Sequence, residues 1–134
     1  MAGYSGTPLP KKLGMLPGTT VFFDGGSLDI RGVTLAKRLG RDVDIVHLFT
    51  KSAGELGKKL RDYRKRLRDD ATVWISWPKK SSKVATDITE DTVRAICLPM
   101  GWVDVKVCAV DEIWSGLKLV VRKELRASGR ESLR

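Results

Sequence analysis

The chain has 134 residues and a mass of 14.9 kDa, a size typical of one domain. Its composition is 42% hydrophobic and 31% charged, which excludes a generically disordered chain. Lysine and arginine number 25 against 16 acidic residues, and the resulting charge of +9 favours anionic partners such as phosphates, nucleic acid or acidic proteins. No apolar run approaches the roughly 18–20 residues that span a bilayer, and the N-terminus lacks a signal pattern, so we expect a cytoplasmic protein without a membrane partner.

Few residues suit metal or triad chemistry. Cys97 and Cys108 lie in apolar stretches without metal-ligand spacing, which predicts buried free thiols. The single histidine, His47, lies in the middle of an apolar run, where a structural role is favoured over that of a catalytic base. The sequence therefore predicts no metal site and no Ser-His-Asp triad.

The N-terminal third alternates between turn residues and apolar runs. Residues 1–18 are rich in proline and glycine, which predicts an extended arm. A β-rich run at 19–23 predicts the first strand, and a helix is expected over 28–39, ended by Gly40. Residues 42–49 then predict the second strand.

The middle of the chain carries two amphipathic patterns. Apolar residues at spacings of three and four predict a helix over 53–67, with Ser52 as its cap. Residues 71–77 predict the third strand. Asp87 and the glutamate three residues later have capping-box spacing, which predicts a helix from 88 to about 100.

The C-terminal part predicts a hairpin. Residues 102–110 alternate with a period of two, 111–116 predict a turn, and 117–122 predict the last strand. The basic segment 123–134 is expected to be a tail, which leaves 19–122 as the single folded domain.

These elements define a fold class. Strands that alternate with helices imply parallel βαβ units, whereas the short connection between the last two strands forces an antiparallel pair. We therefore predict an α/β, Rossmann-like fold. It has an open, mostly parallel sheet of about five strands with one antiparallel C-terminal strand, and helices on both faces.

Polar residues follow the strands at their carboxyl ends, where open parallel sheets bind ligands. If the topology is right, four segments meet there, and we call them together the strand-end rim. They are Asp24-Gly25-Gly26-Ser27, Thr50-Lys51-Ser52, Lys79-Lys80-Ser81-Ser82-Lys83 with Thr86-Asp87, and Asp111-Glu112-Ile113-Trp114-Ser115.

Each part of the rim has two interpretations. The glycine turn at 24–27 suits a phosphate cradle or a plain strand-to-loop turn. The lysine loop (residues 79–83) suits phosphate binding or a solvated loop that protects the preceding strand from aggregation. Trp114 suits stacking on a ligand or packing back on its own hairpin. The aspartates suit a divalent cation or simple capping, and capping is the expectation.

The helix over 53–68 carries a surplus of positive charge. This basic face suits nucleic acid or another polyanion, but a solvated outer face is the simpler interpretation, because no aromatic residues interleave with the charges. The residues concerned are Lys58, Lys59, Arg61, Arg64, Lys65, Arg66 and Arg68.

Long motifs carry a family resemblance. They are Ser5-Gly6-Thr7-Pro8-Leu9-Pro10-Lys11-Lys12-Leu13-Gly14, Trp77-Pro78-Lys79-Lys80-Ser81-Ser82-Lys83 with Thr86-Asp87-Ile88, and Val105-Lys106-Val107-Cys108-Ala109-Val110-Asp111-Glu112-Ile113-Trp114-Ser115-Gly116-Leu117. Over nearly the whole chain the sequence resembles a bacterial family known as domain of unknown function 3052. That resemblance implies no particular activity and no catalytic residues.

The order of elements also resembles a shortened class I methyltransferase. Residues 44–49 and 73–78 are similar to that fold's fourth and fifth strands, and the closing hairpin is similar to its sixth and seventh. The resemblance implies S-adenosylmethionine as a cofactor near Asp24 to Ser27. The segment between Gly26 and Asp42 has room for one helix but not for the two further strands that, in the methyltransferases it resembles, bring the acid that binds the ribose.

The leading hypothesis is a binding module, without an intact catalytic set and without a cofactor, for an anionic ligand or partner. The alternatives are a reduced methyltransferase-like protein that binds S-adenosylmethionine, and a nucleic-acid-binding protein that uses the 53–68 helix and the tail. The candidate ligand-binding residues are Asp24, Gly25, Gly26, Ser27, Lys51, Lys79, Lys80, Ser81, Ser82, Lys83, Asp87, Asp111, Glu112, Trp114 and Ser115.

Overall fold

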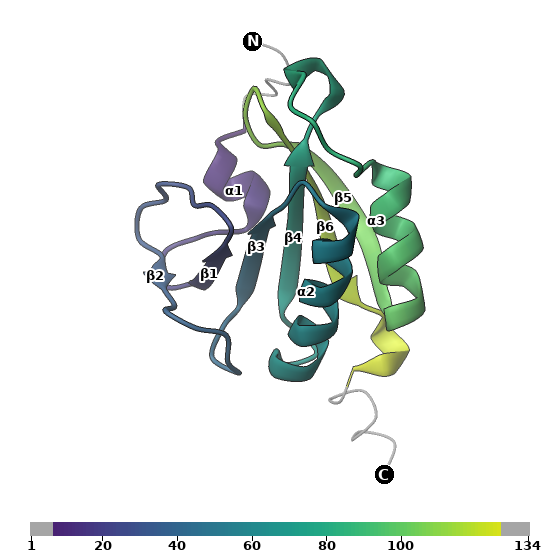
Figure 1. Cartoon of the computed structure of the whole chain (residues 1–134). Helices are drawn as coiled ribbons and strands as arrows, with labels where there is room; N and C mark the ends of the chain where they lie inside the picture. The colour runs from purple at the N-terminus through teal and green to yellow at the C-terminus, as the bar shows by residue number, and fades with distance from the viewer. Residues whose placement is uncertain (1–6, 127–134) are drawn as a thin grey trace.

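A computed structural model describes residues 7–126. One sheet of six strands runs through the molecule in the order β2-β1-β3-β4-β6-β5 (Figure 1). Neighbours from β2 to β4 pair in parallel, and β6 is antiparallel to both β4 and β5. The predicted open, mostly parallel sheet with an antiparallel C-terminal strand is confirmed, with one strand more than expected. The strands are β1 (Thr20–Asp24), β2 (Thr34–Leu35), β3 (Ile45–Phe49), β4 (Thr72–Pro78), β5 (Trp102–Ala109) and β6 (Trp114–Val121).

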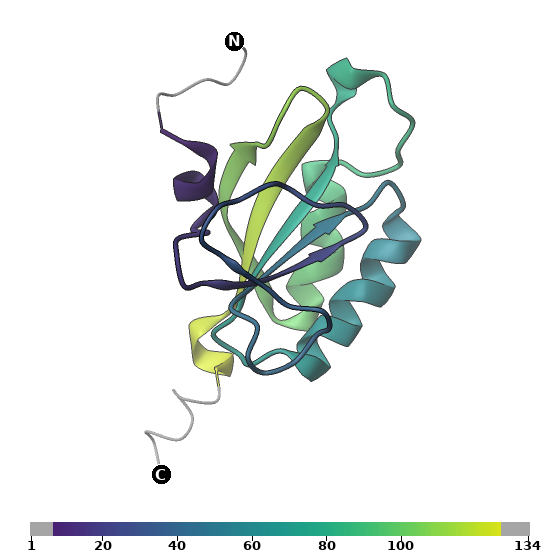
Figure 2. The same ribbon diagram turned by 90° about the vertical axis from the view of Figure 1, so that its left-hand side faces the viewer.

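Helices cover both faces of this sheet. Figure 2 shows α2 and α3 on one side and the short α1 on the other. The helices are α1 (Leu9–Leu13), α2 (Ala53–Arg66) and α3 (Glu90–Cys97), with 3₁₀ turns η1 (Lys80–Ser82), η2 (Leu98–Met100) and η3 (Lys123–Leu125).

Each face therefore buries its own core. Leu56 and Leu60 of α2 pack with Trp77 and other apolar residues on one side of the sheet, and Leu13 packs with Trp74 on the other. The Trp74 indole N–H donates to the backbone oxygen of Leu13 at 3.0 Å. Strand alternation places the two tryptophans, three residues apart, on opposite faces, as the pleat of a strand requires.

The predicted extended arm is wrong for residues 9–13, which form α1. Leu13 and Met15 are buried, and Gly14 ends the helix in the left-handed region at φ 73°. Glycine tolerates this conformation without the steric cost of a Cβ. Burial of apolar side chains against β4 thus fixes a segment whose prolines suggested an irregular chain, while residues 1–6 lie outside the described part.

The predicted helix over 28–39 is also wrong. Residues 25–33 form an irregular segment, and Thr34–Leu35 is a short strand parallel to β1. Gly32 adopts φ 82° and packs against Pro17, which is incompatible with a helix at that point. Leu28 and Ile30 instead pack onto the α1 side of the sheet.

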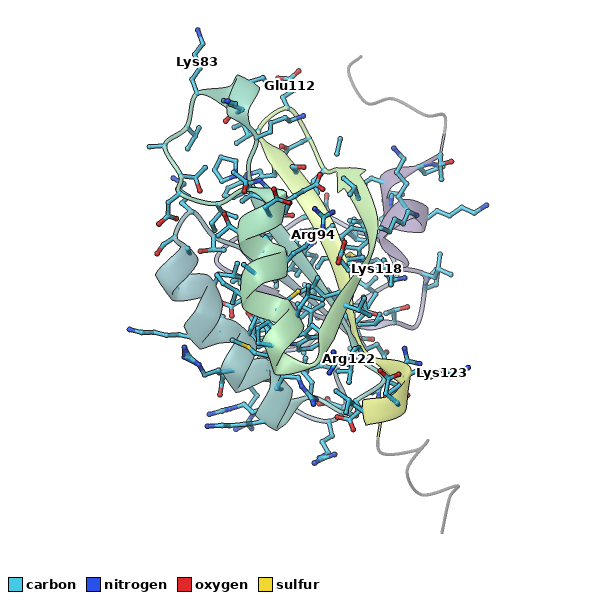
Figure 3. All side chains as sticks on the ribbon, turned by 90° about the vertical axis from the view of Figure 1, so that its right-hand side faces the viewer. Lys83, Arg94, Glu112, Lys118, Arg122 and Lys123 are labelled. Carbon is cyan, nitrogen blue, oxygen red and sulfur yellow. The ribbon has the colours of Figure 1, made fainter. Side chains whose placement is uncertain are left out.

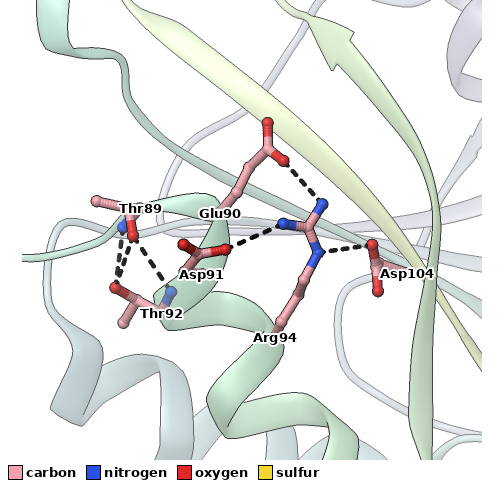
Figure 4. Close-up of polar contacts among 6 residues, drawn as sticks. All are labelled: Thr89, Glu90, Asp91, Thr92, Arg94 and Asp104. Carbon is pink, nitrogen blue, oxygen red and sulfur yellow. Dashed lines mark hydrogen bonds and ion pairs between the residues drawn. The ribbon is translucent and has the colours of Figure 1, made fainter.

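The start of α3 differs from the predicted capping box at Asp87. The Thr89 side chain accepts from the backbone N–H of Thr92, and the Thr92 hydroxyl accepts from the backbone N–H of Thr89 (Figure 4). Arg94 then joins the helix to β5 through Asp104, at 2.9 Å. Asp87 is used elsewhere, at the start of α2, where Ser52 is the cap as predicted.

Three further expectations concern burial and the ends. Cys97 and Cys108 are both buried and free, as predicted. Part of the expected tail is ordered as η3, and residues 127–134 lie outside the described range. Over residues 7–126, no helix is long and apolar enough to cross a membrane.

Candidate functional site

The structure brings the four segments of the strand-end rim together at one end of the sheet. Trp114 pairs with Pro78, and the backbone N–H of Lys79 donates to the oxygen of Ile113 at 2.8 Å. The Thr86 hydroxyl donates to the backbone oxygen of Lys51 at 2.7 Å. Residues far apart in the sequence are therefore neighbours, as the predicted topology requires.

In the β1–β3 half of the rim, Asp24 is engaged within the protein. The hydroxyl of Tyr63 on α2 donates to its carboxylate at 2.6 Å, and the Lys59 amine does so at 3.0 Å. Burial and this hydrogen bond to Asp24 raise the pKa of Tyr63 above its usual range. Asp24 thus fastens α2 to the end of β1 and is not available to a ligand.

The glycine turn closes over the neighbouring strand. Gly25 adopts φ 78°, and a Cβ at this position would overlap the backbone oxygen of Phe49. A Cβ at Gly26 would lie 2.9 Å from the Phe49 ring. The turn therefore rests on the end of β3 and offers no open cradle there, while Ser27 beside it is exposed.

Beneath this turn lies a buried polar pair. His47 and Ser76 are both fully buried, and the His47 Nε2 atom lies 2.6 Å from the Ser76 hydroxyl. The imidazole stacks on Phe49 with ring centroids 4.4 Å apart. Burial lowers the pKa of the His47 imidazole to about 3, so the ring is neutral. Neither side chain meets the solvent, and their contact links β3 to β4 inside the protein, in line with the structural role expected for His47.

The β4–β6 half of the rim has a different character. Lys80 and Lys83 are exposed and Lys79 is half-buried. Lys51 follows β3 but is joined to this half through its backbone oxygen and Thr86, and it is exposed as well. None of these four amines has a carboxylate partner within residues 7–126. Figure 3 shows the Lys83 side chain projecting from the tip of the loop, away from the sheet.

The hydroxyls of the lysine loop divide into a structural and an exposed one. The Ser82 hydroxyl donates to the oxygen of Lys79 at 2.7 Å and accepts from the N–H of Val84 at 3.2 Å. Ser81 is exposed. Ser82 therefore shapes the loop, whereas the Ser81 hydroxyl makes no side-chain hydrogen bond within residues 7–126.

The acidic residues of this half serve mostly as turn and capping groups. Asp87 accepts from the backbone N–H of Ala53 at 2.8 Å, at the start of α2. Asp111 accepts from the N–H groups of Ile113 and Trp114, both at 2.8 Å. Glu112 is exposed, at the same end of the molecule as Lys83 (Figure 3). No group of three or more potential metal ligands occurs among the described residues.

Trp114 begins β6 and does not lie in a turn, a correction to the predicted 111–116 turn. The carboxylate of Asp111 closes the turn early, so the strand starts three residues before the prediction. The half-buried indole packs edge-on against Phe49, 5.2 Å between centroids. By strand alternation Phe49 points to the α1 side, whereas the chain after β4 bends toward α2 (Figure 2). The indole and the lysine loop therefore flank opposite sides of the end of β4, with Ser115 next along β6.

The basic face of α2 is largely neutralised. Four of its seven predicted cations form ion pairs with carboxylates, namely Lys59 with Asp24, Arg64 with Asp69, Arg66 with Asp62, and Arg68 with Asp44. Only Lys58, Arg61 and Lys65 lack such a partner among the residues described. The helix charge seen in the sequence is used mainly to hold the fold.

Comparisons with known proteins identify the fold. No family model and no curated protein matches the sequence. A crystal structure of a candidate type 11 methyltransferase from Sulfolobus solfataricus is similar, with a TM-score of 0.59, 14% identity, and coverage of 86% of this chain and 90% of that one. The chain has a Rossmann-like, methyltransferase-type fold.

Two other structures agree with this fold. The tRNA methyltransferase TrmK of B. subtilis has a TM-score of 0.55 and 7% identity, over 84% of this chain and 64% of its own. LepI in complex with S-adenosylmethionine has a TM-score of 0.53 and 9% identity. This chain spans 39% of LepI, so the likeness concerns one part of that enzyme.

The residues at the ends of β1 and β2 do not supply the groups expected to bind S-adenosylmethionine. No helix follows β1, so no helix N-terminus faces the end of that strand to bind a carboxylate. The glycine turn is closed on Phe49, and β2 is followed by Ala36, Lys37 and Arg38, without the acid that the methyltransferase resemblance places there for the ribose. Between Gly26 and Asp42 the structure has the two-residue strand β2 and no helix, so this segment does not hold two further strands, as predicted.

Proposed function

We propose that the chain binds a phosphate-bearing ligand at the β4–β6 half of the strand-end rim. Lys79, Lys80 and Lys83 would supply the charge, together with Lys51, whose backbone oxygen is bound by Thr86 and Asp87 just after the lysine loop. The observation that carries the proposal is the imbalance at this point: the lysine amines have no carboxylate partners in the described chain, while Asp87 and Asp111 are bound to backbone N–H groups.

The chemistry of these groups favours binding over catalysis. Lysine amines bind phosphate as point charges and need little geometric fit. The one serine–histidine pair is fully buried beneath the glycine turn, so neither group reaches a ligand at the surface. A ligand here would be held by charge and by the exposed Ser81 hydroxyl.

Isothermal titration with inorganic tripolyphosphate tests the proposal. We expect the Lys79→Ala/Lys80→Ala variant to bind about tenfold more weakly, because each exposed charge contact is worth somewhat under 1 kcal/mol. The matched control is Lys58→Ala/Lys65→Ala, which removes two unpaired lysines from α2 and should leave the affinity unchanged. Equal affinity of the loop variant and the unmodified protein would exclude the lysine loop as the site.

S-adenosylmethionine binding is the second candidate, and the fold of the similar structures favours it. The ligand would then lie near the ends of β1 and β3. The lysine loop follows β4, the next strand of the sheet. Calorimetry with S-adenosylmethionine decides the matter, since the closed glycine turn predicts no measurable heat. Micromolar binding that persists in the Lys79→Ala/Lys80→Ala variant would instead assign the methyltransferase-like function.

A further inference from the structure

The outer strand β5 leaves its backbone open at one edge of the sheet. It pairs only with β6 within the described chain, and Figure 1 shows it at the margin of the sheet. Val105, Lys106 and Val107 are exposed one after another, with 53% of Val105 and 51% of Val107 accessible. Consecutive exposed residues in a strand mean that the strand edge itself, and not one face only, meets the solvent.

Lysines gather beside this edge on the α1 side of the sheet. Lys106 stands opposite Lys118 in the β5–β6 register, and its amine donates to the backbone oxygen of Lys12 at 3.2 Å. Burial raises the pKa of the Cys108 thiol, and the positive charges of Lys12 and Lys106 offset part of that increase. None of the three lysines has a carboxylate partner within residues 7–126.

The two sides of the edge differ in chemistry. Lys106 points to the α1 side with its register partner Lys118, which Figure 3 labels on the sheet. Val107 pairs with Leu117, a residue of the α2/α3 core, and so points to the other side. A strand added at this edge would meet positive charge on one face and an apolar side chain on the other.

We propose that the β5 edge binds an extended acidic peptide as an additional strand. Its backbone would pair with the open N–H and C=O groups of β5, the mode known as β-augmentation. Its acidic side chains, at every second position, would face Lys106, Lys118 and Lys12. The apolar residues between them would cover Val107.

Charge and backbone chemistry select this occupant over two others. A second copy of the chain would bring the same lysines to the same edge, and like charges across neighbouring strands are destabilising. The irregularity between Asp104 and Lys106 also disfavours a long, regular pairing with an identical strand. Nucleic acid offers the charge but no peptide groups to continue the sheet.

The test uses a synthetic peptide of alternating glutamate and valine, roughly eight residues long. We expect binding that slows hydrogen exchange at those amides of residues 105–107 that point away from β6. The same peptide with a central proline should bind at least tenfold more weakly, because proline removes a donor from the pairing. Slowed exchange confined to residues 79–83, or equal binding of the proline peptide, would overturn the proposal in favour of simple charge attraction.

Charge reversal supplies the second measurement. Lys106→Glu should weaken binding of the glutamate–valine peptide at least tenfold and create binding of a lysine–valine peptide. Lys65→Glu, at another exposed lysine without a carboxylate partner among the described residues, on α2, should change neither. Circular dichroism confirms folding of both variants. Unchanged peptide affinity in Lys106→Glu would refute the acidic peptide as the partner. So would a dimer, seen by light scattering, that protects the β5 amides from exchange, or an oligonucleotide that binds this edge more tightly than the peptide does.

Discussion

The two halves of the strand-end rim use polar residues in opposite ways. In the β1–β3 half, Asp24 is bound by Tyr63 and Lys59, and the His47–Ser76 pair is sealed beneath the glycine turn. In the β4–β6 half, Asp87 and Asp111 are bound to backbone N–H groups, and the lysines have no carboxylate partners in the part of the chain described. The end of the sheet is thus not uniform: the first half uses its polar side chains in contacts within the protein, and the second keeps lysines without carboxylate partners among the described residues. Substitutions in the first half should change stability alone, and those in the second should change affinity alone.

The largest expected effect belongs to Gly25→Ala. The new methyl group would meet the backbone oxygen of Phe49 in a left-handed conformation, so we expect a loss of about 3 kcal/mol or more in the free energy of unfolding. Gly18→Ala is the matched control, because Gly18 has φ 88° but open space around it, and it should cost only about 1 kcal/mol. Urea denaturation measures both. Similar losses would show that the glycine turn does not rest tightly on β3.

Acid should weaken the same half through His47. Its folded-state pKa of about 3 lies below the unfolded value of 6.5, so the unfolded chain binds the proton more readily and stability falls as the pH drops below 6.5. The slope starts at half of about 1.4 kcal/mol per pH unit and reaches that value about one unit lower, which predicts a loss of roughly 2 kcal/mol between pH 6.5 and 4.5. Urea titrations at several pH values measure this slope.

A control separates this slope from that of the carboxylates. The pKa of Asp44 is lowered mainly by the N–H of Thr20, and that of Asp104 by Arg94, so their stabilisation is lost only as the pH falls below about 4. The double variant His47→Leu/Ser76→Ala removes both members of the buried pair, and its stability should be flat from pH 6.5 to 4.5. A slope that persists in this variant would show that another group titrates.

An intermediate effect is expected for Tyr63→Phe. The substitution removes a buried hydrogen bond to a carboxylate and should cost about 2 kcal/mol of stability, with unchanged affinity for tripolyphosphate. Lys59→Met removes the half-exposed ion partner of the same carboxylate and should cost less than about 1 kcal/mol. A change of tripolyphosphate affinity in either variant would contradict the separation of the two halves.

The smallest effect is expected for Glu112→Gln in the β4–β6 half. Removing an exposed negative charge near the lysine loop should tighten tripolyphosphate binding by about twofold at low salt and leave stability within about 0.5 kcal/mol. Glu124→Gln at the opposite end, in η3, should change neither quantity. Calorimetry in 20 and in about 200 mM salt gives the comparison, and the gain should shrink as salt screens the charge. No gain at low salt would place the anion elsewhere.

Much of the fold was predictable because it depends on local patterns. The alternation of residues 102–110 and the short connection after it specified an antiparallel hairpin, and the periodicity of residues 53–67 specified α2. Two segments failed for tertiary reasons. Residues 9–13 become helical as Leu13 packs against Trp74, and residues 28–39 lose their expected helix as Leu28 and Ile30 pack onto the sheet.

The candidate site was predicted in its location but not in its composition. The topology placed the four rim segments together, yet nothing local revealed that Asp24 would be bound by Tyr63, 39 residues away. Tyr63 lies among the buried residues of its helix, and nothing in the sequence indicates a partner for its hydroxyl. The lysines at the β5 edge were missed for the same reason, since Lys12, Lys106 and Lys118 come from distant segments.

The amino-acid sequence by itself determined the order of strands and helices from β3 onward, the antiparallel last strand, and the end of the sheet at which polar groups collect, because hydrophobic periodicity and connection length are local properties. Only the tertiary structure decided which charges remain available to a partner. Counter-charges and hydrogen bonds arrive from residues dozens of positions away, as when Asp87 turns to the start of α2, and such pairings exist only once the chain has folded.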